Sequence, residues 1–350
     1  MSTQKNILYL YTEAMGYTKI VIDQLVVLGY EIHLVHWDAR RLTSYNFPLT
    51  RGVKLYKRSL FGNKELKSLA LDINPCLCVV SGWQDKAYLP VAYLLRKKGI
   101  PVVTCFDQNF DGTLKQHIGS GFSAIGLLKL FFTHAWVSGP SQFHYALKFG
   151  FNRENIIMDL LSADTSLFRP AIAPKKSGNN FELIYVGRLE QVKGFAILVA
   201  AWRKFIARFP DEARLTVIGD GSMRSLLNDC PQTDWLGFLD SSEIVDRLNA
   251  SDCAVVPSLY EPWGVVVHEH ASCGLPLILS DDVGSRHVFF IEGFNGFSFK
   301  SGDIDSLSLA IERVYLLSLK ERRSFSISSQ NLAQRISPLS SAMNLLSLLK

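Results

Sequence analysis

The sequence predicts an α/β protein made of two Rossmann-like, doubly wound domains that face each other across a cleft. Short apolar runs, many of them rich in β-branched residues, alternate with segments of helical length, which is the pattern of βαβ units around a parallel sheet. The chain has 350 residues, enough for two domains of ordinary size. A polar stretch over residues 169–180 interrupts the alternation, and we interpret it as the linker between the domains.

The predicted strands lie on both sides of this linker. In chain order they are Asn6–Tyr11, Glu31–His36, Leu77–Val80, Val102–Phe106, Ala135–Ser138, Phe181–Val186, Leu215–Ile218, Cys253–Pro257 and Leu277–Ser280. We therefore expect an N-terminal domain over residues 1–170 and a C-terminal domain over residues 171–330. A closing helix is expected over residues 331–350, where apolar residues recur at helical spacing.

The composition is that of an ordinary globular protein, with 48% hydrophobic and 20% charged residues. No window approaches the roughly 18 uncharged apolar residues that a membrane-spanning helix needs, and the N-terminus lacks the pattern of a secretory signal. A cytoplasmic location is therefore expected. The six cysteines are scattered without zinc-type spacing, so we expect reduced thiols and no metal site.

The charge is unevenly distributed between the two halves. Residues 1–170 carry 19 lysines and arginines against 12 aspartates and glutamates, whereas residues 171–350 carry 18 against 20. A nucleic-acid partner is not expected, because dense basic runs with interleaved aromatic residues are missing. Weak attraction of the first half to an anionic membrane or an anionic acceptor is one interpretation, and an incidental surface imbalance is an equal alternative.

A first candidate binding segment covers residues 182–194. It reads as a buried strand that ends at Gly187 and is followed by Arg188 and, five positions later, Lys193. Two cations at a strand-to-helix junction suit a diphosphate, because glycine allows close backbone approach and the helix that follows offers free N–H groups. Taken alone, the segment fits equally well with two solvated loop cations.

A second candidate segment covers residues 255–276. Glu261 and Glu269 stand eight positions apart, with Glu261 expected in an extended loop and Glu269 about one turn inside a helix. The backbone amides of Gly264, Val265 and Val266 would form an anion and hydroxyl site at the start of that helix. Carboxylates accept hydrogen bonds from sugar hydroxyls, so the segment suits a polyol ligand.

Together these segments resemble the C-terminal half of the retaining, nucleotide-sugar-dependent glycosyltransferases of family four, of bacterial surface-glycan type, which have the two-Rossmann-domain (GT-B) fold. The similarity covers residues 182 to about 315. It continues, in order, through segments 215–221, 250–258, 273–276 and 293–303.

The resemblance implies a role for each matching residue. Arg188 and Lys193 would clamp the diphosphate, and Glu269 would bind the ribose hydroxyls. Glu261, with the backbone of Gly264–Val266, would hold the transferred sugar and the distal phosphate.

The first half matches the family more loosely. The loop after the first strand keeps Gly16 as the one glycine able to approach a phosphate or an acceptor. Many members place a histidine near the reacting sugar after the strand that here spans Val102–Phe106. This chain has Asp107 at that point instead, which makes Asp107 a catalytic candidate.

The resemblance implies a metal-independent, retaining, hexosyltransferase-like enzyme. It would move a sugar from a nucleoside diphosphate sugar, with a UDP-sugar favoured over a GDP-sugar, to a hydroxyl of a glycan or lipid-linked acceptor in surface polysaccharide or glycolipid synthesis. No cofactor beyond the donor is implied, and peripheral attachment to the inner face of the membrane is a further expectation. A catalytically silent nucleotide-sugar-binding subunit and a sugar-nucleotide epimerase are the alternatives.

Three weaker signals receive structural interpretations. Gly219 and Gly221 suit a tight turn rather than a dinucleotide loop, because the third glycine position holds Arg224. Asp303 or Asp305 suits an N-cap of a helix near residue 307. His268 and His270 cannot face one metal from a helix, so one is expected in the core and the other on the surface.

Overall fold

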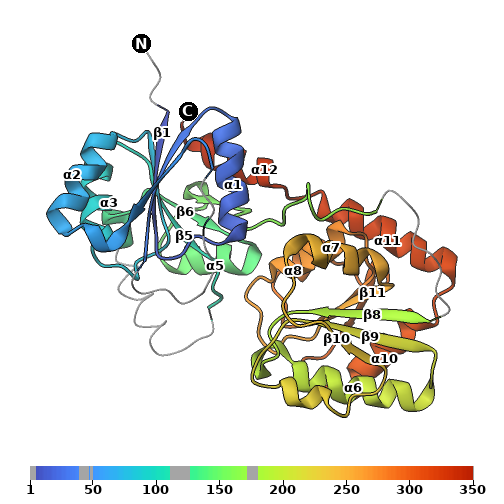
Figure 1. The fold of residues 1–350 in the computed structure, drawn as a ribbon. Coiled ribbons are helices and arrows are strands. Elements are labelled where there is room, and N and C mark those ends of the chain that lie inside the picture. The colour runs from blue at the N-terminus through green and yellow to red at the C-terminus, as the bar shows by residue number, and fades with distance from the viewer. Residues whose placement is uncertain (1–4, 39–46, 48–49, 111–126, 172–179, 350) are drawn as a thin grey trace. The chain divides into compact units, whose positions relative to one another are not determined.

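The computed structural model of the chain describes residues 5–38, 47, 50–110, 127–171 and 180–349, which form two compact units (Figure 1). Unit 1 comprises the described residues within 1–162 and 338–350, and unit 2 comprises those within 163–337. Each unit is a parallel β-sheet with helices on both faces.

Unit 1, in its described residues, has a seven-stranded parallel sheet in the order β3-β2-β1-β4-β5-β6-β7. The strands are β1 (Asn6–Tyr11), β2 (Glu31–His36), β3 (Val53–Lys57), β4 (Leu77–Val80), β5 (Val102–Phe106), β6 (His134–Val137) and β7 (Ile156–Ile157). The order reverses between β1 and β4. In sheets of this kind, ligands bind beyond the carboxyl ends of the strands at such a switch point.

Helices cover both faces of this sheet (Figure 1). On one face, α2 (Asn63–Ile73), α3 (Tyr88–Lys97) and α5 (Pro140–Lys148) contribute to one apolar core with the strands. On the other face, α1 (Gly16–Val27) packs against α12 (Pro338–Leu346). Short 3-10 helices are η1 (Arg58–Leu60), η2 (Leu128–Leu130), η3 (Arg153–Asn155) and η6 (Ser347–Leu349).

Unit 2, in its described residues, has a six-stranded parallel sheet in the order β10-β9-β8-β11-β12-β13. The strands are β8 (Phe181–Val186), β9 (Ala213–Ile218), β10 (Thr233–Trp235), β11 (Cys253–Val256), β12 (Leu277–Ser280) and β13 (Gly296–Phe299). This sheet reverses its order between β8 and β11, so the loops that follow these two strands lie at its switch point.

The helices of unit 2 also form two layers (Figure 1). One apolar core holds α6 (Phe195–Arg208) and α10 (Ile304–Tyr315) against the sheet. The opposite layer contains α7 (Ser241–Ala250), α8 (Val265–Ser272), α9 (Arg286–Phe289) and α11 (Leu319–Ala333), and α11 packs directly on α8. The 3-10 helices of this unit are η4 (Gln191–Lys193) and η5 (Arg224–Leu227).

All nine predicted strands are present, with bounds within two residues of the expected ones. Four further strands, β3, β7, β10 and β13, were not predicted. These four are the edge strands of the two sheets. The α/β, doubly wound architecture of each half is as expected.

The chain divides differently from the expected ranges of 1–170, 171–330 and 331–350. Residues after Ser162 already belong to unit 2, where the Ala163 N–H donates to His268 Nδ1 at 2.9 Å and the Ala171 N–H donates to Asn249 Oδ1 at 3.0 Å. Of the expected linker, residues 172–179 lie outside the described residues. The chain crosses back at Pro338, so α12 completes unit 1.

Two further expectations concern membranes and thiols. Among the described residues, no helix is both long and apolar enough to cross a membrane. All six cysteines are free thiols, as expected, and four of them are buried.

Candidate functional site

The loop after β8 carries the first predicted site residues. Gly187 follows the strand directly, and its N–H donates to the Ile218 carbonyl at 3.0 Å. The Tyr185 hydroxyl donates to the Arg188 carbonyl at 2.7 Å. Gly219 cannot carry a side chain, because a Cβ there would lie 2.0 Å from the Gly187 carbonyl oxygen. The turns after β8 and β9 are thus packed backbone to backbone, and this packing places Arg188 at the carboxyl edge of the sheet.

A glycine also brings Lys193 to the loop after β11. Gly194 has a φ of +68°, and a Cβ at this position would lie only 1.8 Å from the Pro257 carbonyl oxygen. Beside it, the Leu259 N–H donates to the Val192 carbonyl at 2.9 Å. Two loops that are far apart in the sequence therefore run against each other.

Lys193 and Glu261 form an ion pair between Nζ and Oε2. Their side chains are 22% and 13% exposed, so the pair is largely shielded from water. The Ser258 hydroxyl donates to the same carboxylate oxygen at 3.4 Å. Because a lysine ammonium group has three N–H donors, the pair leaves donors of Lys193 for an anionic ligand.

Gly264 begins the helix that carries the second predicted segment. It is the N-cap of α8 with a φ of +87°, and a Cβ there would lie 2.8 Å from Glu261 Cγ. The Ser285 hydroxyl donates to the Gly264 carbonyl at 3.0 Å and fixes the turn. Since Val265 opens the helix, the N–H groups of Val265 and Val266 have no acceptor within it. These amides, with Glu261 beside them, can bind an anion or a hydroxyl.

Glu269 lies one turn into α8, as expected. Burial raises the pKa of its carboxyl from 4.5 to about 7. A carboxyl group with this pKa changes between proton donor and acceptor near neutral pH, so its ability to accept hydrogen bonds from a ligand depends on pH.

Both histidines of α8 are fully buried, so the expectation that one lies on the surface was wrong. His268 Nδ1 accepts from the Ala163 N–H, and its Nε2 donates to the Ala333 carbonyl at 3.0 Å. Its ring also stacks on Phe289 at 4.1 Å between centroids. Helix α8 is covered by α9 and α11 as well as by the sheet, and this leaves no exposed side for His270. Burial lowers the pKa of His268 to about 4 and that of His270 to about 3.

Arg188 is exposed and lines a pocket of about 430 Å³ at the ends of β8 and β9. Gly187 and Gly219 form part of its wall, and the 87% exposed Phe238 forms another part. The pocket is mostly apolar, and its two charged lining residues are Arg188 and Asp220. A flat ring bearing a phosphate fits that composition, because the ring can pack on apolar atoms while the cation meets the charge.

The structure places the two remaining predicted residues in unit 1. Gly16 is the first residue of α1. Asp107 follows β5 and lines a hollow beside the end of β1, together with Tyr17 and Glu13. The Gln142 amide donates to the Asp107 carbonyl at 2.8 Å and holds this backbone in place.

The glycine and aspartate motifs have the structural roles expected for them. Gly221, like Gly219, meets backbone: a Cβ there would lie 2.6 Å from the Leu189 carbonyl oxygen. Asp303 caps α10 by accepting from the Ser306 N–H at 2.9 Å, and Asp305 pairs with Lys204. Among the described residues, no group of three or more His, Cys, Asp or Glu residues could hold a metal ion.

Four residues that hold the loops of the site in place were not predicted from the sequence. Close backbone approach at Gly194 brings two loops together. Hydrogen bonds from the hydroxyls of Ser258, Ser285 and Tyr185 hold the loops in place. Only Gly194 gave a usable signal, because it directly follows Lys193 in the motif.

Comparison with protein families gives a match in the second half of the chain. Residues 171–331 match the family described as Glycosyl transferases group 1. This part of the chain is therefore similar to the group 1 glycosyltransferases, in line with the resemblance found in the sequence.

Curated relatives match in the same region. Glycogen synthase of Mycobacterium tuberculosis is 36% identical over 140 residues, covering 38% of this chain and 33% of that protein. The UDP-Gal:alpha-D-GlcNAc-diphosphoundecaprenol alpha-1,3-galactosyltransferase of Escherichia coli is 34% identical over 146 residues, covering 39% and 37%. The chain thus spans about a third of the length of the curated relatives that it matches.

Solved structures match over nearly the whole chain. Sucrose-phosphate synthase from Thermosynechococcus elongatus has a TM-score of 0.73 at 17% identity, covering 98% of both chains. HepE of Anabaena in complex with UDP-glucose has a TM-score of 0.71 at 17% identity, covering 98% of this chain and 99% of that one. These neighbours have the GT-B fold, which confirms the predicted fold class.

Proposed function

We propose that the protein is a retaining glycosyltransferase that moves a hexose from a nucleoside diphosphate sugar, preferably a UDP-sugar, to a hydroxyl group. The observation that carries the proposal is the shielded Lys193–Glu261 ion pair beside the N-terminus of α8. It joins a cation suited to a diphosphate with a carboxylate suited to a sugar hydroxyl. The UDP and UDP-glucose of the HepE structures support the choice of donor.

The roles follow from where charge develops during transfer. As the glycosidic bond breaks, negative charge grows on the diphosphate and positive charge on the sugar ring. In this proposal Arg188, Lys193 and the amides of Val265 and Val266 stabilise the first charge, and Glu261 stabilises the second. A preorganised donor of this kind is typically worth about 3 kcal/mol of barrier. Glu269 binds the ribose.

Retention and metal independence are parts of the same proposal. Attack on the face of the departing diphosphate, with a phosphate oxygen taking the acceptor proton, needs no protein nucleophile. Two cations and a helix N-terminus supply the positive charge that a metal ion supplies elsewhere. Asp107 is the candidate catalytic residue from unit 1, and Gly16 is the candidate for close backbone approach to the ligand.

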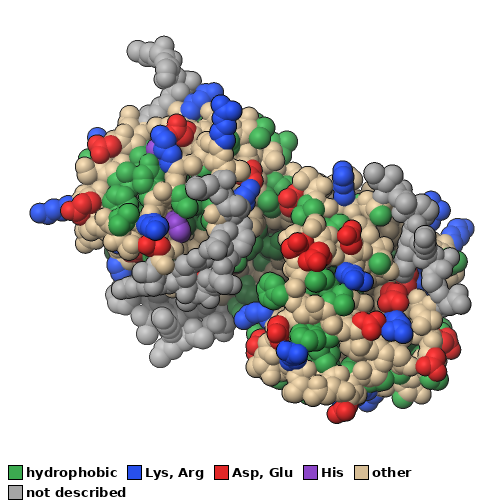
Figure 2. All heavy atoms as spheres, viewed as in Figure 1, with side chains coloured by type: hydrophobic (Ala, Val, Ile, Leu, Met, Phe, Trp, Pro, Cys, Tyr) green, Lys and Arg blue, Asp and Glu red, His purple; other side chains and the backbone are tan. Residues whose placement is uncertain are grey.

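For the acceptor, we propose a glycan or a lipid-linked intermediate in the synthesis of a surface polysaccharide or glycolipid. The named function of the Escherichia coli relative supports this choice. We also propose a cytoplasmic enzyme with peripheral contact to the membrane through its basic first half. Figure 2 shows acidic side chains among the basic ones on the face in view, so the contact is expected to be weak and to decrease with salt.

The decisive test is turnover of UDP-hexoses with and without acceptors, measured as UDP release. Transfer should retain the anomeric configuration of the donor in the product, as read by proton NMR, and should continue in the presence of a chelator. Arg188→Ala should abolish most turnover while the fold persists. Binding of a UDP-hexose without any turnover, hydrolysis included, would identify a silent binding subunit. An epimerised nucleotide formed without acceptor would identify an epimerase.

A further inference from the structure

One histidine of α8 contacts both ends of unit 2. The chain passes between the units twice, within residues 160–163 and 333–338, and we call these two ranges the crossing segments. His268 Nδ1 accepts from the Ala163 N–H at 2.9 Å, at the first residue of unit 2. His268 Nε2 donates to the carbonyl of Ala333, the last residue of α11, at 3.0 Å. A single side chain of α8 therefore holds the backbone of both crossing segments.

The two hydrogen bonds fix one form of the His268 ring. A backbone N–H can only donate and a carbonyl can only accept, so Nδ1 must be the acceptor and Nε2 must carry the proton. Burial lowers the pKa of His268 to about 4, so the ring keeps this neutral form near pH 7. The ring also stacks on Phe289 at 4.1 Å between centroids. Ala163 and Ala333 are both buried, and an apolar side chain in place of His268 could not pair with either backbone group.

The first crossing segment leaves little free chain between the units. The Leu160 N–H donates to the Val137 carbonyl of β6 at 3.1 Å, within unit 1. Three residues later, the Ala163 N–H is bonded to His268, within unit 2. Only residues 161 and 162 lie between these two bonds. A change in the direction of the chain here must be absorbed by two residues or be passed on to His268.

The second crossing segment is bonded on both sides as well. Within unit 2, the Arg335 guanidinium group donates to the Val288 carbonyl of α9 at 3.0 Å. Within unit 1, the Asn344 amide of α12 donates to Asp159 Oδ2 at 3.0 Å. This bond joins residues that flank the two crossing segments. The crossing segments are thus linked to each other through His268 in unit 2 and through Asp159 and Asn344 in unit 1.

Helix α8 also carries donor-binding groups of the proposed function. The N–H groups of Val265 and Val266, which bind the diphosphate in that proposal, lie within one turn before His268. Glu269 follows His268 directly. Because α8 has eight residues, about two turns, a displacement of the His268 backbone displaces these groups with it.

We propose that His268 is a positioning residue of the donor site, which couples the amides of Val265 and Val266 to both crossing segments. An anion bound at the start of α8 should then stabilise the hydrogen bond at Ala163. Loss of the His268 bonds should in turn weaken binding of the anion, because coupling between two sites is reciprocal. The inference rests on the proposed donor site. It adds a residue that contacts neither the donor nor the acceptor.

The test follows hydrogen exchange of the full chain by mass spectrometry, with fragmentation that resolves the Ala163 amide. The probes are UDP and inorganic pyrophosphate, each at a concentration that saturates binding as measured by calorimetry. We expect a bound anion to slow exchange at Ala163 and over residues 334–335 by roughly fivefold or more, the lower end of typical coupling between sites. Binding of both anions without any change at Ala163 overturns the inference.

Three variants separate positioning from packing. His268→Phe keeps a ring that can stack on Phe289 but removes both hydrogen bonds, and it should weaken UDP binding by roughly tenfold and abolish the response at Ala163. His268→Asn retains an acceptor near the place of Nδ1, so the response at Ala163 should persist. His268→Gln retains only a donor near the place of Nε2, so that response should be lost. Unchanged UDP affinity in His268→Phe overturns the inference. If that variant does not fold, equal responses in His268→Asn and His268→Gln overturn it.

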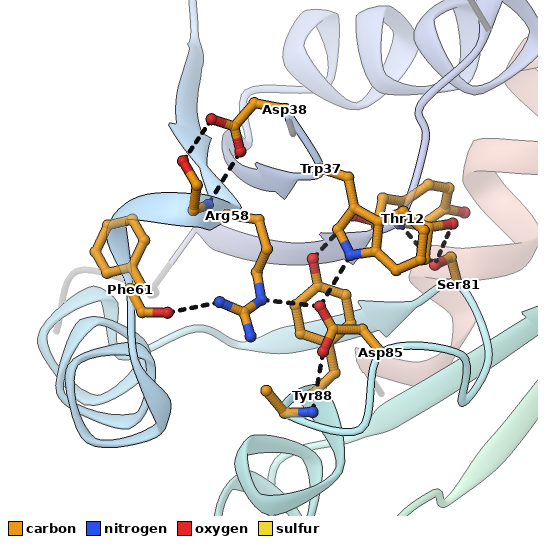
Figure 3. A network of polar contacts seen from close by, with 11 residues as sticks. Thr12, Trp37, Asp38, Arg58, Phe61, Ser81, Asp85 and Tyr88 are labelled. Atoms are coloured by element: carbon orange, nitrogen blue, oxygen red, sulfur yellow. Dashed lines mark hydrogen bonds and ion pairs between the residues drawn. The ribbon is translucent and has the colours of Figure 1, made fainter. Parts of the chain in front are cut away.

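A matched control removes a comparable hydrogen bond from unit 1. The buried Tyr88 hydroxyl donates to the Tyr11 carbonyl at 2.9 Å, in the polar network around Asp85 (Figure 3). Tyr88→Phe should lower the stability of the protein but leave both UDP affinity and the response at Ala163 unchanged. Equal losses of UDP affinity in Tyr88→Phe and His268→Phe would show that lowered stability is the cause, and would overturn the inference.

Failure of this inference can be told apart from failure of the proposed function. Release of UDP from a UDP-hexose, with and without acceptors, is measured on the same samples. If UDP is released while Ala163 does not respond to either anion, only the coupling fails. If Ala163 responds while no UDP-hexose is turned over, only the proposed transfer fails. Failure of both anions to bind also overturns the coupling, and turnover then decides the proposed function by itself.

Discussion

The two candidate sites of this protein are built by different means. In unit 2, glycines let backbone meet backbone, as at Gly194 against Pro257, and the charged side chains Lys193 and Glu261 are paired with each other. In unit 1, the hollow beside the end of β1 is lined by side chains from several strands, and the Tyr9 hydroxyl has no partner among the described residues. A site whose loops are held by close contacts between backbone atoms should be sensitive to a single Cβ atom added at a glycine. A site set by side chains should respond to changes of charge and hydroxyl groups.

The largest effect is expected from Gly194→Ala. The added Cβ would lie 1.8 Å from the Pro257 carbonyl oxygen, so the loop that carries Lys193 must move. We expect donor turnover to fall by roughly 100-fold or more, because a misplacement of about 1 Å has effects of this size. Steady-state UDP release and thermal unfolding measure the change.

Gly293→Ala is the matched control. Gly293 has nearly the same φ of +69° with nothing within 4 Å of the added Cβ. Only backbone strain of roughly 1 kcal/mol should result. Equal losses of activity and stability in the two variants would show that close approach is not what organises the unit 2 site.

The next effect concerns the ion pair. Lys193→Met should lower kcat/KM for a UDP-hexose by about 100-fold to 1000-fold, as loss of a preorganised donor does. It should also lower the free energy of unfolding by about 1–3 kcal/mol, because Glu261 is left shielded without its partner. Adding Glu261→Gln should recover part of the stability but none of the turnover. Additive losses in the double variant would argue against coupling of the two side chains.

A smaller, pH-dependent effect is expected at Glu269. Its raised pKa of about 7 means that the carboxylate acceptor is lost below that pH, so UDP-hexose affinity should fall by up to about tenfold per pH unit as the pH drops. Glu269→Gln should flatten the profile, whereas Arg188→Gln should weaken binding equally at every pH. Calorimetry from pH 5.5 to 8.5 with an intact UDP-hexose distinguishes these patterns.

The stability of the ligand-free protein should change in the opposite sense. A buried carboxyl with a raised pKa favours the folded state most when protonated, below its unfolded value of 4.5. That contribution is lost as the pH rises from 4.5 through about 7. Relative to Glu269→Gln, the unchanged protein should therefore lose stability over this range. A constant difference between the two unfolding curves would contradict the assigned pKa.

The smallest effects are expected from substitutions at two tyrosines of unit 1. Tyr9→Phe removes a hydroxyl without a partner, so the free energy of unfolding should stay constant or rise by up to about 1 kcal/mol. Tyr88→Phe removes a hydroxyl that donates to the Tyr11 carbonyl at 2.9 Å, and should cost about 1 kcal/mol. Urea unfolding measures both. A clear loss in Tyr9→Phe would show that its hydroxyl is already satisfied without ligand.

The sequence predicted the central strands of both sheets and missed the edges. Central strands are covered on both faces, so they read as continuous apolar runs such as Leu77–Val80. Edge strands face water on one side. Val53–Lys57 contains two lysines, Thr233–Trp235 contains an aspartate, and Ile156–Ile157 has only two residues. Such short or mixed segments cannot be distinguished from loops without their sheet partner.

The residues of the unit 2 site could be predicted from the sequence better than those of unit 1. The glycine and carboxylate motifs indicated Arg188, Lys193 and Glu261, but no spacing rule could show that two of these side chains contact each other from separate loops. Tyr9 lies within a strand and reads as an ordinary core residue. The missing partner of its hydroxyl is a property of tertiary packing alone.

Helix α12 has a consequence for how the protein folds during synthesis. Ala342 and Leu345 of this helix are fully buried, and the helix packs on α1, which is made more than three hundred residues earlier. All of unit 2 leaves the ribosome between these two helices. Unit 2 can therefore reach its native state first, while α1 lacks its partner helix until residues 338–346 emerge. Ribosome stalling before and after residue 338 should separate a protease-sensitive unit 1 from a resistant one.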